Sequence, residues 1–167
     1  MKKLLMILPL VLLLCFTFGC QKAEEVAEEG LTEEEVNVVV GEVIKIWNNA
    51  DMAAVDKVYS SDIVYSDPLS GEAGGIDAFK EMVQTAHKER TSINLSIDET
   101  FIKNDKLAAL WTAKETLLNG AEIVVSGVSI VNTVNGKIVK ETVYYDTKKV
   151  LEEMGFKIIL PEEQEEK

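Results

Sequence analysis

Few side chains in this sequence combine a titratable group with apolar surroundings. Asp146 is one of them, because it follows Tyr144 and Tyr145 at the end of an apolar segment. A carboxyl group that faces an apolar cavity has its charged form disfavoured, so its pKa rises into a range useful for proton transfer. The alternative is that Asp146 is the N-cap of a following helix, a common use of aspartate. The sequence leaves both interpretations open.

Glu115 is the second candidate carboxylate. It would share a strand face with Trp111 and could point into a pocket, although exposure on the opposite face is the alternative. His87 is the only histidine and stands beside Lys88-Glu89-Arg90, which favours a surface position and gives no metal-ligand spacing. We therefore expect no metal and no cofactor. The large aromatic side chains are expected to form the core or the wall of a pocket: Trp47, Tyr59, Trp111 and Tyr144.

Residues 1–19 have the layout of a secretory signal peptide, with Lys2-Lys3 followed by an apolar run too short for a comfortable membrane span. The segment Thr17-Phe18-Gly19-Cys20 resembles the lipobox of bacterial lipoproteins, in which the cysteine is lipidated and becomes the new N-terminus. The resemblance implies attachment through Cys20 to the cell membrane or outer membrane, on the extracytoplasmic side. An uncleaved anchor and a plain secretory signal are the alternatives.

The sequence carries a net charge of -12. Removing residues 1–19 takes away two lysines and no acid, leaving 15 basic against 29 acidic residues, or -14. Such a surface repels nucleic acid and anionic headgroups. Residues 20–30 read as an acidic tether and residues 156–167 as an acidic tail. Both cysteines lie within the first twenty residues, so no disulfide is expected in the folded domain.

Helical signals dominate the first half of the remaining chain. Thr32 and Glu35 form a capping box before apolar residues repeated at helical spacing over 36–47. Asp51 can cap a second, short helix. A third helix is predicted to follow the glycine-containing loop 71–75.

After Arg90 the apolar residues recur at every second position, which predicts strands. Asn119-Gly120 and Asn135-Gly136 are hairpin signals, because both residue types accept positive φ. A chain in which helices come first and the strands of a sheet follow is typical of the α+β class. The third long strand has apolar residues on both faces, so we expect helices to cover one face and something else, such as a second subunit, part of the other. The predicted strands are 63–65, 91–102, 106–118, 121–134 and 137–146, followed by a short helix over 147–154 that Gly155 ends.

This order of elements resembles the nuclear transport factor 2-like superfamily and, within it, the SnoaL-like polyketide cyclase group. The resemblance spans residues 31–155. Its landmarks are Ile46-Trp47-Asn48 with Ala50-Asp51, Tyr59-Ser60-Ser61-Asp62, Asp67-Pro68, Gly75 through Phe79, Trp111-Thr112, Asn135-Gly136-Lys137-Ile138, and Tyr144-Tyr145-Asp146 with Met154-Gly155.

The resemblance implies a cone in which a curved sheet and three helices enclose a largely apolar pocket, often in a homodimer. Members include cyclases, isomerases, dehydratases and simple binding domains. In the cyclases an aspartate at the position of Asp146 is the general acid/base. Where those enzymes tend to carry Gly-Thr-His, this chain has Glu115-Thr116-Leu117, so the histidine is missing.

Three functions remain open at this point. The first is a lipid-anchored domain that binds a small apolar or amphipathic molecule, with Asp146 at the mouth of its pocket. The second is a cyclase or isomerase that uses Asp146, with Glu115 or a tyrosine as partner. The third is an accessory subunit whose sheet face docks a membrane-protein partner. We rank them in this order, because only one of the expected acid/base positions is filled.

Overall fold

The computed structural model describes residues 30–157. The predicted signal peptide, the predicted lipidation site Cys20 and most of the predicted tether and acidic tail lie outside these residues. Within them, no helix is long and apolar enough to cross a membrane. The elements in chain order are α2 (Glu33–Asn49), α3 (Met52–Val58), β1 (Tyr59–Asp67), β2 (Gly71–Gly74), α4 (Ile76–Lys88), β3 (Arg90–Lys103), β4 (Lys106–Leu117), β5 (Glu122–Val134), β6 (Lys137–Tyr145) and α5 (Thr147–Glu153).

Three of the four described helices, α2, α3 and α5, begin where a polar side chain caps their first backbone amides, whereas α4 begins at Gly75 without such a cap. Thr32 and Glu35 form the predicted capping box of α2, and Asp51 caps α3. Asp146 caps α5 by accepting a hydrogen bond from the Lys149 amide at 3.0 Å. The chain leaves α2 through Ala50, which takes the left-handed conformation at φ 52° without being a glycine.

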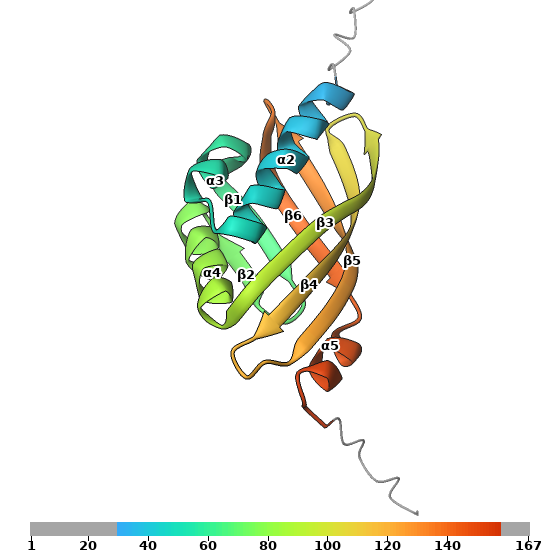
Figure 1. Cartoon of the computed structure of the whole chain (residues 1–167). Helices are drawn as coiled ribbons and strands as arrows, with labels where there is room; N and C mark the ends of the chain where they lie inside the picture. Colours follow the sequence, from blue (N-terminus) through green and yellow to red (C-terminus); the bar gives the residue numbers. More distant parts are fainter. Residues whose placement is uncertain (1–29, 158–167) are drawn as a thin grey trace, which may run out of the picture.

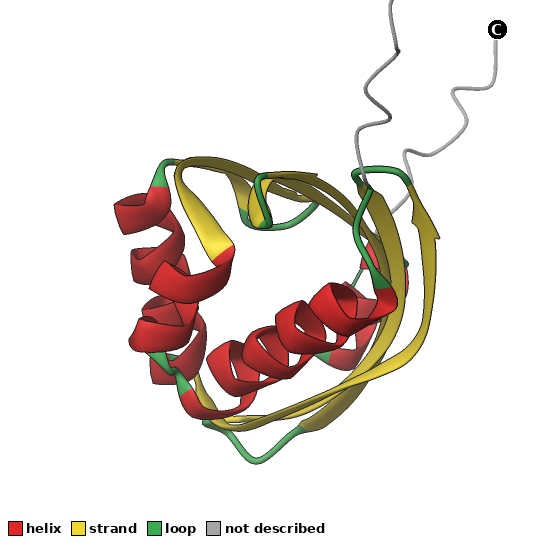
Figure 2. Cartoon of the chain, turned by 90° about the horizontal axis from the view of Figure 1, so that it is seen from above, coloured by secondary structure: helices red, strands yellow, loops and turns green. Residues whose placement is uncertain are grey.

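One six-stranded sheet, in the order β2-β1-β6-β5-β4-β3, curves around the helices. Its long strands β3 to β6 are antiparallel neighbours, as predicted. Two features differ from the prediction. The first strand is longer than residues 63–65 and pairs in parallel with β6, and the predicted loop contributes the edge strand β2. Figures 1 and 2 show α2 crossing the concave side of the sheet, with α3 and α4 beside it and α5 at the lower end.

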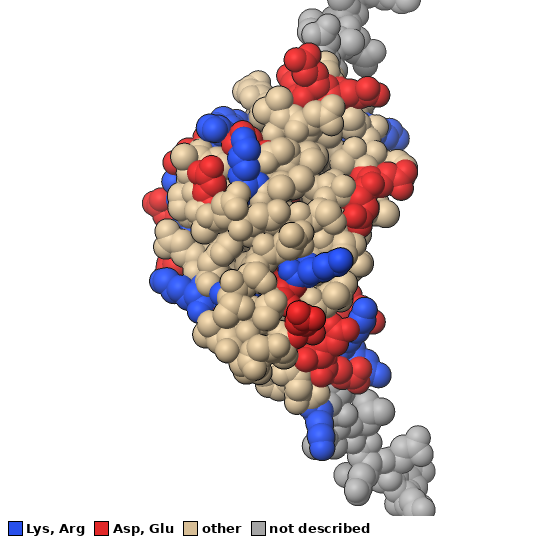
Figure 3. Space-filling view, viewed as in Figure 1, with Lys and Arg blue, Asp and Glu red and all other residues tan. Residues whose placement is uncertain are grey.

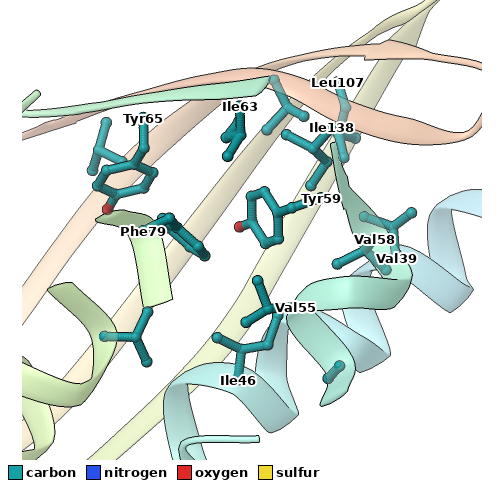
Figure 4. Close-up of a cluster of buried hydrophobic side chains, with 14 of the residues drawn as sticks. Val39, Ile46, Val55, Val58, Tyr59, Ile63, Tyr65, Phe79, Leu107 and Ile138 are labelled. Carbon is teal, nitrogen blue, oxygen red and sulfur yellow. The ribbon is translucent and has the colours of Figure 1, made fainter. Parts of the chain in front are cut away.

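The core lies between α2, α3 and α4 and the concave face of the sheet. Tyr59, Phe79 and Tyr65 form an aromatic group in which Phe79 lies 4.4 Å from the Tyr59 ring and 5.1 Å from the Tyr65 ring, centroid to centroid. Ile46 from α2 and Ile138 from β6 pack into the same cluster (Figure 4). This packing fills one end of the cone and leaves the remainder of the concave face hollow.

Candidate functional site

A cavity of about 720 Å³ lies between the concave face of the sheet and the helices. Side chains of α2 and α4 form one wall, and the inner faces of β3 to β6 form the other. Its exposed lining residues lie on the β1–β2 hairpin and on α4, which places the mouth there. Val150 and Met154 of the α5 segment add to the lining. The volume falls in the range of small-molecule binding sites.

Glu141 is the most deeply buried carboxyl group of the cavity wall, with 6% of its surface exposed. The Tyr59 hydroxyl donates a hydrogen bond to Glu141 Oε2 at 2.7 Å, and the Ser129 side chain is a second hydrogen-bond partner. Burial raises the pKa of Glu141 above its ordinary value, and these two hydrogen bonds offset part of that rise. Glu141 therefore keeps its proton to higher pH than an exposed glutamate and can act as a proton donor or acceptor.

Tyr65 stands beside Glu141 on the neighbouring strand. The two residues are register partners in the parallel β1–β6 pair, and both line the cavity. Burial and the nearby Glu141 raise the pKa of Tyr65 well above its usual range, so its hydroxyl stays protonated. Together Glu141 and Tyr65 form one polar end of the cavity.

Two further polar pairs lie farther along the cavity wall. The Tyr145 hydroxyl donates a hydrogen bond to Asp67 Oδ1 at 3.1 Å. Burial and the charge of Asp67 raise the pKa of Tyr145. Arg90 donates to Glu115 through Nε and to the Ala86 carbonyl at 3.2 Å. Glu115 is therefore an inward carboxylate, with its charge already paired.

The indole ring of Trp111 lies against the backbone of Gly127. A methyl group at Gly127 would stand 2.5 Å from the Trp111 ring and 2.5 Å from the Tyr144 carbonyl oxygen. Trp111, Gly127 and Tyr145 are register partners across β4, β5 and β6. The two aromatic rings meet edge to face over the glycine, with centroids 6.1 Å apart. Gly127 therefore lets the indole lie close to the sheet.

The structure brings Trp47, Trp111 and Glu115 to the cavity, but three of the predicted positions need correction. Asp146 is exposed and absent from the lining, because it stands past the end of β6 and caps α5. Tyr59 is 1% exposed and packs behind the wall rather than on it.

Tyr144 is 57% exposed and absent from the lining. Adjacent strand residues point to opposite faces, so Tyr144 faces outward where Tyr145 faces inward. His87 is partly buried rather than on the open surface, and its Nε2 atom has no hydrogen-bond partner within the described chain.

Sequence reasoning missed Glu141, although a signal was available. Glu141, Val143 and Tyr145 recur at every second position and so share one strand face. An acid in an otherwise apolar inward series is the pattern of a buried functional group. Within residues 30–157, no cluster of three or more histidine, cysteine, aspartate or glutamate side chains could hold a metal ion.

Comparisons with known proteins agree with this architecture. The family model described as SnoaL-like polyketide cyclase matches residues 37–154. A structure of TsrD from Streptomyces laurentii superposes with a TM-score of 0.68 at 15% identity, over 75% of this chain and 98% of that one. An NTF2-like protein of unknown function from Burkholderia pseudomallei gives 0.67 at 18% identity, over 75% and 100%.

A putative SnoaL-like polyketide cyclase from Shewanella denitrificans gives a TM-score of 0.64 at 14% identity, over 74% of this chain and 98% of that chain. Identities this low establish a shared fold and nothing finer. A search of curated proteins returned no significant match.

Proposed function

Because the chain belongs to the SnoaL-like polyketide cyclase family, we propose that its domain binds a small, largely apolar molecule inside the cavity, with Glu141 as the polar contact. The observation that carries the proposal is a cavity of about 720 Å³ with a buried, hydrogen-bonded carboxyl group on its wall. A concave, mainly apolar site with a few placed polar groups is typical of small-molecule binding.

Filling the cavity tests the proposal. Ala109 lines the cavity on β4, whereas the neighbouring Ala108 is absent from the lining. Ala109→Phe should occupy ligand space and abolish binding of a neutral fluorescent probe such as N-phenyl-1-naphthylamine. Ala108→Phe, one residue away on the other face, is the matched control and should bind as the unaltered chain does. If a folded Ala109→Phe variant, checked by circular dichroism, binds the probe unchanged, the cavity is not the binding site.

A second candidate function is a cyclase- or isomerase-type enzyme in which Glu141 replaces Asp146 as the acid/base. The raised pKa of Glu141 favours this candidate, because a general acid or base works best when its pKa lies near the working pH. Glu141→Gln keeps the shape and the hydrogen-bond acceptor but cannot transfer a proton. In an enzyme it should remove turnover and leave ligand affinity nearly unchanged. In a binding protein no turnover exists to be lost.

We also propose that the chain is an exported lipoprotein attached through Cys20. The support is the sequence alone: a basic start, an apolar run and Gly19-Cys20. The two acyl chains expected on such a cysteine would hold the protein firmly to a membrane. The domain would then act at the cell envelope.

The outer face of the sheet supports a proposal about partners. Leu110, Ile130 and Tyr144 are each at least 37% exposed there. Leu110 and Tyr144 flank Val128 in one row across three strands. Exposed apolar patches mark interaction sites. We propose that a second copy of the chain covers this face, with a membrane-protein partner as the alternative occupant.

A further inference from the structure

Acidic side chains dominate the mouth of the cavity. Glu72 on the β1–β2 hairpin, Glu81 on α4 and Glu89 at the C-cap of α4 are exposed members of the lining. Asp67, at the end of β1, is a partly buried member. Among the described residues that line the cavity, Arg90 is the only lysine or arginine. The entrance therefore has an excess of negative charge.

Arg90 does not neutralise this excess. Its Nε pairs with Glu115, and its Nη1 lies 3.7 Å from Glu89. Glu72 and Glu81 form no ion pair with any residue of the described chain.

Within the part of the chain that the structure describes, Asp67 accepts hydrogen bonds only from groups that carry no charge. They are the Tyr145 hydroxyl at 3.1 Å, the Leu69 amide at 2.9 Å and the Ser70 amide at 2.7 Å. At neutral pH several carboxylates at the mouth therefore have no cationic partner in the domain.

A separate observation identifies a polar group that a bound molecule could contact. Tyr65 is 4% exposed and lines the cavity beside Glu141. Its hydroxyl is not an enclosed orphan, because within residues 30–157 the only buried side-chain polar atom without a hydrogen-bond partner is His87 Nε2. The Tyr65 hydroxyl is therefore available to a polar atom of a molecule bound at this end of the cavity.

The mouth and the interior select for different properties of the ligand. Apolar side chains such as Ile97 and Val125 surround most of the interior and favour an apolar body. A cleft lined by charge of one sign concentrates counter-ions and repels ions of the same sign. At separations of 6 to 10 Å in water, a few uncompensated carboxylates shift the affinity for a unit charge by roughly several-fold at low salt.

We propose that the ligand of this cavity is an amphipathic cation, with its apolar body between sheet and helices and its positive group at the acidic mouth. The inference rests on the proposed binding function and adds the charge of the ligand to it. It excludes fatty acids and other amphipathic anions as good ligands.

Three probes that share one alkyl chain test the inference: decyltrimethylammonium, decanol and decyl sulfate, each below its micelle-forming concentration. Both tryptophans of the chain, Trp47 and Trp111, line the cavity, so their fluorescence reports binding directly. At low ionic strength the cation should bind several-fold more tightly than the alcohol, and the alcohol more tightly than the sulfate. A higher salt concentration should reduce these differences in affinity.

A pair of double variants separates the mouth from the overall charge. Glu72→Gln with Glu81→Gln should bring the affinity for the cation close to that for the alcohol and leave the affinity for the alcohol unchanged. Glu34→Gln with Glu99→Gln removes the same charge from exposed positions outside the lining and should leave the preference for the cation intact.

The outcomes distinguish the two proposals. If decanol binds and the cation binds no more tightly, the ligand is not cationic, although the binding function stands. If both double variants reduce the preference equally, bulk charge explains it and the inference fails. If none of the three probes binds, the proposed binding function fails as well.

Discussion

A single buried acid sets the chemistry that this cavity can offer. Glu141 is enclosed by β-sheet and aromatic side chains, yet two hydroxyl groups hydrogen-bond to it. Burial disfavours the carboxylate and the hydroxyl donors favour it, and burial is the larger effect. Glu141 therefore holds its proton to higher pH than an exposed glutamate. It can donate a hydrogen bond to a ligand or transfer the proton.

The raised pKa of Glu141 predicts a pH-dependent stability. The unfolded chain ionises near the ordinary value and the folded chain only at higher pH. The contribution of Glu141 to the free energy of unfolding is therefore largest below the ordinary pKa, and it falls as pH rises through the folded pKa. The fall is at most about 1.4 kcal/mol per pH unit.

Glu141→Gln should remove this dependence. Urea unfolding of both proteins at a series of pH values gives a difference curve that isolates Glu141 from exposed acids such as Glu35, whose pKa is lowered. A difference curve that is flat between acid and neutral pH would show that Glu141 titrates as an ordinary exposed carboxyl group.

The close packing around Gly127 predicts that a substitution there lowers stability for a steric rather than an electrostatic reason. A Cβ atom there would overlap the Trp111 ring and the Tyr144 carbonyl, and the carbonyl belongs to backbone that cannot move freely. Gly127→Ala should therefore lower the free energy of unfolding by about 1–3 kcal/mol and shift the tryptophan emission. Gly41 in α2 has no neighbour within 4 Å of such a Cβ. The control Gly41→Ala should instead stabilise by about 0.5–1 kcal/mol. Equal effects of the two changes would contradict this account.

Strand periodicity was enough to place some site residues and not others. Trp111 and Glu115 are four residues apart on β4 and so share a face, as predicted. The same rule separates Tyr144 from Tyr145, but sequence alone does not say which of the two faces inward. Asp146 illustrates a further limit, because one residue past a strand end the side-chain direction is set by the cap of the next helix.

At the scale of elements, local signals located the helix starts and the hairpins. Thr32 with Glu35, and the Asn135-Gly136 pair with φ of 51° and 72°, act within a few residues and can be read directly. The parallel pairing of β1 with β6 joins Tyr65 to Glu141 across a long stretch of chain. No local pattern encodes that contact, and this pairing creates the polar end of the cavity. The part of the site that sequence reasoning missed is therefore the part that long-range pairing builds.

The cap of α5 gives a prediction at this scale. The Asp146 carboxylate accepts from the Lys149 amide, and asparagine caps helices about as well as aspartate. Asp146→Asn should change stability by only a few tenths of a kcal/mol, whereas Asp146→Ala should cost about 1 kcal/mol. Thermal unfolding followed by circular dichroism measures both. Neither change should alter probe binding, because Asp146 lies outside the lining. Loss of binding with intact stability in the asparagine variant would restore Asp146 as a site residue.

For the whole molecule, the outer sheet face predicts an oligomer. Ile130 is 40% exposed at the centre of that face, next to Ala108 and Thr142 in the register. If a second copy covers the face, Ile130→Glu would bury an unpaired charge and should convert a dimer to a monomer. Light scattering with size exclusion measures the mass. Leu118→Glu, at the exposed β4–β5 hairpin, is the control and should leave the mass unchanged. A monomeric unaltered chain would favour the membrane-protein partner instead.

The distribution of surface charge and the position of the N-terminal end of the described chain bear on how a lipid-anchored domain would be oriented. Acidic side chains gather beside the start of α2 and near the lower end of the domain (Figure 3). The described chain begins at the upper end, where the Leu31 amide hydrogen-bonds to the Asn104 carbonyl at 3.1 Å (Figure 1). The β1–β2 hairpin and the end of α4, which form the mouth, lie in the lower half. An anchor at Cys20 would therefore attach to the end of the domain remote from the mouth.

This arrangement yields a prediction with two readouts. Cys20→Ala should abolish lipid attachment, so that the protein leaves the membrane fraction or accumulates as a precursor. The ten residues from Gln21 to Gly30 could extend at most about 35 Å, which is enough to separate the domain from the headgroups.

A mouth remote from the anchor receives its ligand from the aqueous side, so the purified Cys20→Ala protein should bind probes as the lipidated protein does. Fractionation and mass spectrometry of the N-terminus give the first readout, and tryptophan fluorescence gives the second. A processed Cys20→Ala protein that still sediments with membranes would refute the anchor, and probe binding that requires the lipid would refute the aqueous route.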